Sequence, residues 1–424
     1  MGRINSNIII EASNITIEGG DDSHFDAMPF TGIAAVDLAA GQQAAGIRAS
    51  NWVDFVGAVT TPAVLPPASA NGAALSSNGR LLAVAHNNAP FVTIYHMTSG
   101  VPVRVANPDV PPASTGNSLA FSPDGRFLAV GHSTTPFVTI YDMTSDVPVK
   151  IPDPEILPAG AGVGVAFSSD GRWLAVAHSN SPRITIYDMG SGVPVKTANP
   201  GVLPPANSRC VTFSPDGRLL VVGTTSVGSS VRMAIYDMTS GVPIKTADPD
   251  TPPASAVNSL AFSPDGRLLA VAHNTTPFVT IYEMNGDIPV KLPDPEVLPA
   301  STGNGAAFSS DGRLLVIAHN NAPFMTMYDM SDGVPAKMPD LAVLPTGTAN
   351  GAAFSSDGRF LAVVTSSTPY VAVYYTNTFD MLLPSPLAAA AMVYARADIF
   401  AGVGFMRHDT DKGEVGTADL LLFK

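Results

Sequence analysis

Apolar runs and turn-forming residues alternate along this chain in one unit that recurs at a nearly constant spacing. Each copy places a Gly-Arg pair between two apolar runs. The glycines of these pairs are Gly79, Gly125, Gly171, Gly217, Gly266, Gly312 and Gly358. The spacing is 46 residues, except for one step of 49 between the fourth and fifth copies. Such a period, with several short strands per copy, is typical of a propeller blade. Seven copies therefore predict a ring of seven blades.

The second copy illustrates the four strands that each unit predicts. Residues 118–121 form a short strand, and the turn at 122–125 offers Pro, Asp and Gly at positions that suit them. Residues 127–131 are apolar throughout, as expected for a strand buried on both faces. Residues 137–141 are β-branched and aromatic. The fourth strand, 147–150, contains a Pro that fits only an outer edge.

These copies resemble the WD-repeat and related bacterial seven-bladed propellers. Ser-Pro-Asp-Gly-Arg, then an apolar run, then Ile140-Tyr141-Asp142 is similar to the family's first turn and its Trp-Asp position. The resemblance covers roughly residues 71–383. Tyr replaces Trp in every copy and the family's Gly-His pair is absent, so the family's hydrogen-bonded tetrad is not carried over.

The resemblance implies how each blade is oriented in the ring. The first strand of each blade lines the axis. The links between blades, such as residues 151–162, share one face with the loops after the second strand, such as 132–136. We call this face the top face.

Two segments compete to complete the last blade. Residues 55–59 lie 46 positions before 101–105, the outer strand of the first copy, and the link at 65–68 also matches the repeat. Residues 379–383 compete for the same place. The matching link favours the N-terminal segment.

The two flanks, residues 1–54 and 388–424, lie outside the repeat and are similar to each other. Each predicts a strand, a Gly-containing turn and a second strand, beginning at 32–36 in one flank and at 402–406 in the other. An isolated hairpin is marginally stable at best. We therefore expect an all-β chain in which the propeller, residues 55–387, is inserted into one small β-barrel built from both flanks.

This split module resembles the small β-barrels of tailed-phage head-decoration (cement) proteins. Those proteins carry similar Gly-Val-Ala and Ala-Gly-Glu segments and a similar terminal strand. The resemblance implies a barrel that sits on a capsid lattice and a propeller displayed outward.

The composition and the net charge limit the kinds of partner that we expect the protein to bind. Charged residues make up 13% of the chain, and 37 Gly with 38 Pro suit a loop-rich β protein. The formal net charge of −13 disfavours nucleic acid, because phosphates attract clustered Lys and Arg. No apolar run reaches the ~18 residues of a membrane span, so we expect no membrane partner.

One polar position recurs where the first strand begins. It holds Asn71, Asn117, Asn258, Asn304 and Asn350, with Val163 and Arg209 in the other two copies. The next position holds small residues, among them Cys210, which we expect to fill space rather than to react. The asparagines either bond the preceding links, as Asn often does in turns, or form a polar ring at the top mouth of the channel that binds a sugar or peptide.

The fourth copy departs most from the pattern. Residues 224–230 include three additional positions, and Arg209 and Arg232 lie nearby in sequence. A change in one copy breaks the symmetry of the ring, as a specific site requires. The candidate ligand-binding residues are therefore Asn71, Asn117, Arg209, Arg232, Asn258, Asn304 and Asn350.

Five histidines share one position at the end of the second strand. They are His86, His132, His178, His273 and His319, and Thr224 and Thr365 occupy it in the other copies. A metal needs ligands within about 2.0–2.1 Å, and equivalent positions on adjacent blades are much farther apart. We expect each histidine to bond a loop of its own blade, and we expect no metal site.

Acidic pairs in the links, such as Asp153 with Glu155, lack the 12-residue ligand loop of strong calcium motifs. Ser, His and Asp occur in every blade, so no single triad stands out, and no phosphate-cradling Gly loop is present. We predict no catalytic residue and no cofactor.

The sequence thus predicts a non-enzymatic phage virion protein of the capsid-decoration type, located on the capsid surface and homo-oligomeric on the particle. Its barrel would bind the major capsid protein or neighbouring virion proteins, and its propeller a host-surface glycan or protein. Two alternatives stay open: a bacterial interaction propeller outside any virus, and a glycan-active or lyase-type propeller enzyme.

Overall fold

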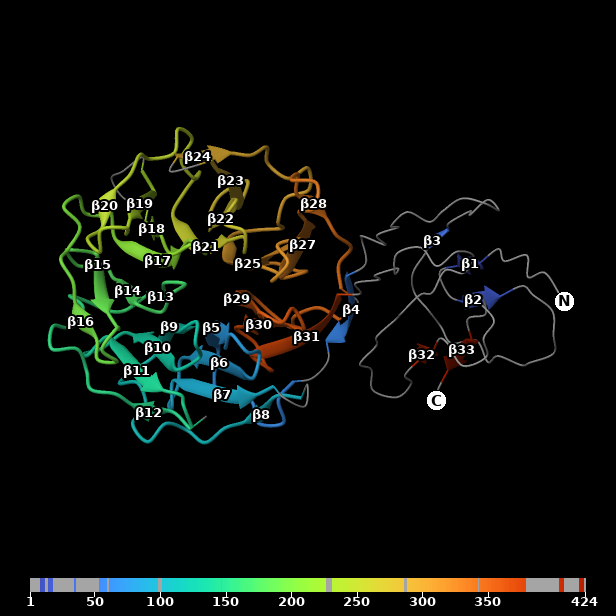
Figure 1. The fold of residues 1–424 in the computed structure, drawn as a ribbon, viewed down its shortest axis with the longest axis horizontal. Helices are drawn as coiled ribbons and strands as arrows, with labels where there is room; N and C mark the ends of the chain where they lie inside the picture. Colours follow the sequence, from blue (N-terminus) through green and yellow to red (C-terminus); the bar gives the residue numbers. More distant parts are fainter. Residues whose placement is uncertain are drawn as a thin grey trace, which may run out of the picture. The chain divides into compact units, whose positions relative to one another are not determined.

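The computed structural model describes most of the repeat region and short strands in the flanks. The described residues are 8–11, 14–17, 34–35, 53–58, 61–97, 101–145, 147–225, 231–285, 288–341, 343–378, 404–407 and 419–422. Every regular element within them is a β-strand. The strands of the repeat region form seven four-stranded sheets arranged around a ring, which confirms the all-β, seven-bladed propeller (Figure 1).

The first strand of each blade lies nearest the ring axis (Figure 1). These strands are β5 (Ala70–Leu75), β9 (Gly116–Phe121), β13 (Gly164–Phe167), β17 (Ser208–Phe213), β21 (Val257–Phe262), β25 (Gly303–Phe308) and β29 (Ala349–Phe354). The second strands follow outward. They are β6 (Leu81–His86), β10 (Phe127–His132), β14 (Trp173–Ala177), β18 (Leu219–Thr224), β22 (Leu268–His273), β26 (Leu314–His319) and β30 (Phe360–Thr365).

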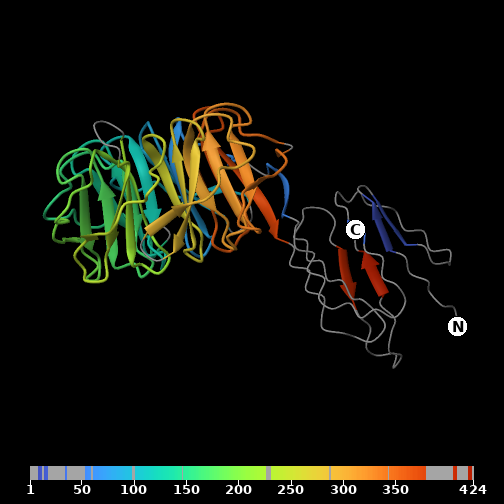
Figure 2. The ribbon, with the colours of Figure 1, turned by 90° about the horizontal axis from the view of Figure 1, so that it is seen from above.

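The third and fourth strands complete each blade toward the rim. The third strands are β7 (Val92–His96), β11 (Val138–Asp142), β15 (Ile184–Asp188), β19 (Met233–Asp237), β23 (Val279–Asn285), β27 (Met325–Asp329) and β31 (Val371–Thr378). The fourth strands are β8 (Val103–Arg104), β12 (Val149–Lys150), β16 (Val195–Lys196), β20 (Ile244–Lys245), β24 (Ile288–Lys291), β28 (Ala336–Lys337) and β4 (Val53–Ala58). Figure 2 shows the strands of the ring running between its two faces.

The turn between the first two strands has a fixed hydrogen-bond pattern, shown here for the second blade. The Gly125 amide donates to the Ser122 carbonyl (2.8 Å), and Asp124 Oδ1 accepts from the Arg126 amide (3.0 Å). Ser122 Oγ accepts from the Phe127 amide (2.8 Å). Gly125 has a φ of +70°, where a side chain would be strained. The recurring Ser-x-Asp-Gly-Arg sequence is therefore the chemistry that this turn requires.

The core lies between the blades. In the first blade every residue of β6 is buried, with Leu82 and Val84 fully inaccessible. One face of that blade packs against Leu128 and Tyr141 of the second blade, and comparable clusters fill the other blade interfaces. Full burial of a Val or Leu side chain stabilises the fold by roughly 1.5–3 kcal/mol. Both faces of the second strand need a neighbouring sheet, as its uninterrupted apolar sequence predicts.

The tyrosine in the Trp-Asp position has its own bonding pattern. Its ring is fully buried, and in five blades its hydroxyl donates to a carbonyl of the link that enters the same blade. For Tyr95 this acceptor is the Val64 carbonyl at 2.9 Å, and for Tyr141 it is the Val110 carbonyl at 2.9 Å. In these five blades the tyrosine therefore connects the link to its blade.

The N-terminal segment closes the ring. Strand β4 is the fourth strand of the last blade, beside β31, which confirms the segment favoured by the sequence. Its rival, residues 379–383, lies outside the described residues. The last blade also packs on the first through Phe360, Val364, Leu82 and Tyr95.

The flanks contribute two further sheets. One has the order β2–β1–β3, with β1 (Ile8–Glu11), β2 (Asn14–Ile17) and β3 (Ala34–Ala35), and the other pairs β32 (Gly404–Arg407) with β33 (Asp419–Leu422). By its contacts the chain divides into residues 55–376 and a second unit of residues 1–54 and 377–424. Most of the expected barrel falls outside the described residues, so the barrel stays a prediction.

Strand β4 offers a test of ring closure. A chain of residues 61–378 leaves β31 as an open edge, whereas residues 53–378 keep the fourth strand. We expect the shorter chain to melt at least about 5 °C lower, because a loss of 1 kcal/mol already shifts the midpoint of a large domain by about 2–4 °C. Thermal unfolding followed by circular dichroism measures the difference. Equal midpoints would contradict closure by β4.

Candidate functional site

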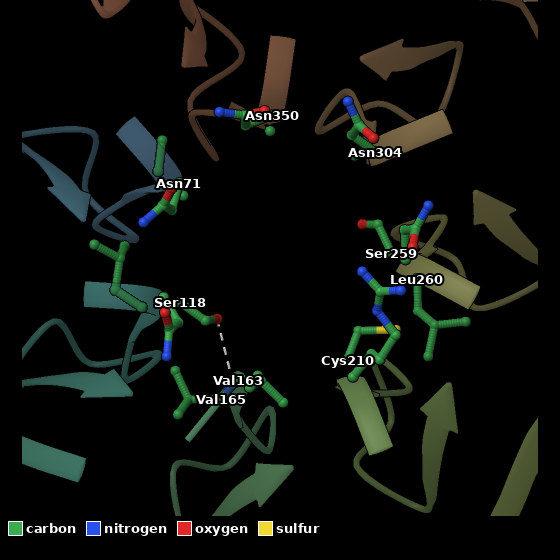
Figure 3. A pocket seen from close by; sticks show the side chains of 18 of the residues that line it. Asn71, Ser118, Val163, Val165, Cys210, Ser259, Leu260, Asn304 and Asn350 are labelled. Carbon is green, nitrogen blue, oxygen red and sulfur yellow. Dashed lines mark hydrogen bonds between the residues drawn. The ribbon is translucent and has the colours of Figure 1, made fainter. Parts of the chain in front are cut away.

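The first strands surround a central channel that opens on the top face (Figure 3). Within the channel is a cavity of about 190 Å³, and above it lies a wider cavity of about 590 Å³. We call the wider cavity the channel mouth. Its lining residues are Asn71, Arg209, Asn258, Asn274, Thr302, Asn304, Asn320 and Asn350. Asn117 lines the inner cavity.

Six of the seven candidate residues therefore gather around one channel, and a β-bulge positions each of them. In β5 the pairing register shifts between Ala70 and Gly72, so that Asn71 is the extra residue, and in β17 the shift falls between Ser208 and Cys210, at Arg209. A bulge bends the strand and re-aims one side chain. The remaining asparagines occupy the same bulged position.

The asparagine amides connect each blade to the next. Asn304 Nδ2 donates to the Ala349 carbonyl of the following blade at 2.9 Å, and Asn350 Nδ2 donates to the Ala70 carbonyl at 2.8 Å across the ring closure. Asn71, Asn117 and Asn258 make the same bond. We expected these asparagines to bond the preceding links, but their amides bond the start of the next blade instead. The bulge causes this difference, because it turns the side chain toward the neighbouring blade.

The amides also bond the loop that follows the second strand. Asn258 Nδ2 donates to Asn274 Oδ1 (2.6 Å), and Asn304 Nδ2 donates to Asn320 Oδ1 (2.7 Å). A backbone carbonyl only accepts, so the bond to the next blade fixes which end of the amide is nitrogen. Asn304 therefore presents its oxygen to the mouth, while Asn274 and Asn320 retain their N–H groups.

Arg209 stands where five other blades have asparagine. Its side chain is exposed and lines both cavities. It forms no hydrogen bond or ion pair within the part of the chain that the structure describes. Beside it, burial raises the pKa of the Cys210 thiol to about 12. The Cys210 thiol therefore stays protonated at neutral pH. The residue fills space in the channel wall, as its small size predicts.

Arg232 lies apart from the mouth. It lines a separate cavity of about 210 Å³ with Asp248 and Asp250, and its Nη1 donates to the Pro253 carbonyl at 3.0 Å. Arg183 makes the equivalent bond to the Pro204 carbonyl in the preceding blade. Arg232 therefore connects the loop before β19 to the link that contains Pro253. The additional residues beside it, 226–230, lie outside the described part of the chain.

The repeated histidines are structural and neutral. In each of the five blades Nε2 lies 2.9 Å from the hydroxyl of a threonine on the third strand, as for His86 with Thr93. The partner is in the same blade, as expected, but on a strand rather than only in a loop. His178 Nδ1 additionally bonds the Asn180 carbonyl. Burial holds the pKa of His86, His132 and His273 at about 4 and lowers that of His178 and His319.

The acidic link residues pair with lysines. Asp153 accepts from Lys150 at 2.7 Å and Asp294 from Lys291 at 2.8 Å, three residues apart in each case. No cluster of three or more His, Cys, Asp or Glu side chains suited to a metal ion occurs in the described ranges. Among those same ranges no helix is long and apolar enough to cross a membrane.

Sequence reasoning missed three residues of the mouth. Asn274 and Asn320 directly follow the repeated histidines, and Thr302 ends a link. The signal was present, since Asn87 also follows the histidine in the first copy. Only the folded loop shows that this position returns to the inner strand.

Comparison with known proteins supports the fold. A model of the WD domain, G-beta repeat, matches residues 247–276, which contain β21 and β22. Among solved structures, Kuenenia stuttgartiensis hydrazine synthase is 22% identical over 76% of this chain and 100% of the matched chain, with a TM-score of 0.58. U3-55K is 11% identical over 75% and 100%, with a TM-score of 0.56.

At these identities the similarity shows the fold alone, a seven-bladed β-propeller. No curated protein matches the chain. These matches give no support to the resemblance to phage decoration proteins.

The buried histidines predict a pH dependence of stability. Between pH ~6.5, the ordinary pKa of histidine, and the folded value of about 4, the unfolded chain binds protons that the folded protein does not. The free energy of unfolding should be constant with respect to these groups above pH 7 and fall as pH drops from 6.5 to 4. Each histidine adds up to about 1.4 kcal/mol per pH unit.

Urea denaturation at pH 7.5, 6 and 5 measures this slope. The last blade supplies a matched control, because it naturally has Thr365 and Ala372 in place of the His–Thr pair. The double substitution His86→Thr with Thr93→Ala should reduce the slope. Equal stability at pH 7.5 and pH 5 would contradict the assignment.

The asparagine bonds between blades predict a stability effect. Asn304→Ala removes the bonds to the Ala349 carbonyl and to Asn320, so we expect the free energy of unfolding to fall by about 1–3 kcal/mol. Asn199→Ala serves as control, because Asn199 only accepts from Lys196 in an exposed link, and should cost less than about 0.5 kcal/mol. Similar losses in both variants would refute the bonding role.

Proposed function

We propose that the protein is a non-catalytic binding and display protein of a phage virion. In this proposal the flanks anchor the chain to the capsid as a small β-barrel. The channel mouth on the top face of the propeller binds a host-surface glycan or a protein. The observation that carries the binding role is the chemistry of the mouth.

The mouth is built for hydrogen bonding rather than for proton transfer. Within the described part of the chain, its lining consists of asparagines, one threonine and one arginine. A general acid or base must reach the ligand and titrate near the working pH. The amides and the hydroxyl do not titrate there, and a guanidinium offers hydrogen-bond donors only. The five repeated histidines are buried and bonded within their own blades.

The size of the mouth suits a small ligand. Its volume of about 590 Å³ falls within the ~300–1,000 Å³ of ordinary ligand pockets. The bonds between blades hold the lining amides in place before a ligand arrives, and such preorganisation lowers the entropic cost of binding.

The virion part of the proposal rests on the flanks. Their sequences resemble phage decoration barrels, and the flank segments that are described, such as β1 with β2 and β32 with β33, are strands. The net charge of −13 disfavours a role on nucleic acid inside the particle.

Co-sedimentation tests the anchoring role. Capsids are assembled from the major capsid protein encoded nearest to this gene and are mixed with the full chain at micromolar concentration. We expect the full chain to sediment with the capsids, while residues 53–378 stay in the supernatant. If the full chain stays behind, or the propeller alone sediments equally well, the anchoring role of the flanks is wrong.

A further inference from the structure

From the geometry of the channel mouth we infer that its ligand is an acidic saccharide, a sugar whose carboxylate pairs with Arg209 and whose hydroxyls bond the surrounding amides. This inference rests on the proposed function, because it names the ligand class of the same site. Three observations carry it: the position of Arg209, its lack of a partner among the described residues, and the balance of donors and acceptors around it.

The first observation is that Arg209 replaces a stabilising residue. In five blades the bulged position donates a hydrogen bond to the start of the next blade, as Asn350 does to the Ala70 carbonyl. Arg209 makes no such bond to its neighbour among the described residues. The stabilisation that such a bond gives in the other blades is absent here. When the residue in one blade lacks a stabilising hydrogen bond that its counterparts in most other blades form, a functional role for that residue is expected.

The second observation is the charge of Arg209. The other lining residues that the structure describes are neutral, and no carboxylate is among them. Other arginines of the repeat have acidic partners, such as Arg172 with Asp188 at 3.2 Å and Arg218 with Asp237 at 3.2 Å. A free guanidinium offers a planar set of donors that matches a carboxylate in a bidentate arrangement. The mouth therefore favours one negative charge, although the whole chain is acidic.

The third observation is the arrangement of the amides around the mouth. Asn71, Asn304 and Asn350 use their Nδ2 atoms in bonds between blades, so their Oδ1 atoms remain as acceptors. Asn274 and Asn320 use their Oδ1 atoms, so their N–H groups remain as donors. Figure 3 shows Asn71, Asn304 and Asn350 around the opening. Because a hydroxyl both donates and accepts, adjacent hydroxyls of a sugar ring match such a lining.

The lining argues against a peptide. Peptide and protein partners bind chiefly through aromatic and aliphatic anchors that fill apolar pockets. Among the described residues that line the mouth, none is aromatic or aliphatic. An acidic sugar fits this lining better, because its hydroxyls can bond the asparagine amides and its carboxylate can pair with Arg209.

Titration with matched sugars tests the inference. The probes are galacturonic acid, N-acetylneuraminic acid and the neutral sugar galactose, each added to the full chain and followed by ligand-observed and protein-observed NMR. We expect both acids to bind at least tenfold more tightly than galactose. Added salt should weaken the acids and not galactose.

Substitutions assign the effect to the mouth. Arg209→Gln should weaken galacturonic acid at least tenfold and weaken galactose by a much smaller factor. Arg209→Lys should restore part of the affinity, because it keeps the charge but not the bidentate geometry. The control Arg126→Gln removes one positive charge from the turn at the other end of the first strand, where Arg126 contacts Asp142, and should change neither sugar.

The outcomes separate the inference from the proposed function. If acid and neutral sugars bind equally and Arg209→Gln has no effect, the acidic ligand is wrong while glycan binding stands. If none of the sugars binds, both the acidic ligand and the glycan role are wrong. If a peptide with a free C-terminal carboxylate binds in an Arg209-dependent way and the sugars do not, the saccharide class is wrong.

Discussion

Burial of both faces of the second strand is the constraint on which the rest of this structure depends. In β6 and β30, for example, every side chain is buried, alternately against one neighbouring blade and the other. A single blade cannot bury two apolar faces, and a row of blades leaves two faces exposed. Only a closed ring satisfies all of them, and β4 closes it by completing the last blade. The fold is thus set by repeated packing rather than by any unique contact.

The same closure shapes the candidate site. A ring brings the starts of all the first strands to one opening, and in six blades a bulge turns one side chain along it. Where that residue is asparagine, the nitrogen donates a hydrogen bond to the next blade and the oxygen remains an acceptor. Where that residue is Arg209, the side chain presents a positive charge to the channel mouth instead of an amide. Function in this account comes from a departure in one copy within a scaffold kept rigid by the others.

Much of the fold could be predicted from the sequence, because propeller packing is periodic. The spacing of the Gly-Arg pairs predicted the blades, and the match of residues 55–59 to the outer strands predicted the closure. Contacts between copies could not be predicted in the same way. The placement of Arg232 away from the mouth, and the role of Asn274 within it, depend on how a loop folds back over a neighbouring strand. The flanks lack repetition, so their barrel stays a prediction.

A crystal structure of the chain soaked with galacturonic acid tests the central claim most directly. We predict one sugar in the channel mouth, with its carboxylate at hydrogen-bond distance from the Arg209 guanidinium and its hydroxyls on the asparagine amides. A map in which the mouth is empty while the sugar occupies the rim or the opposite face would contradict it.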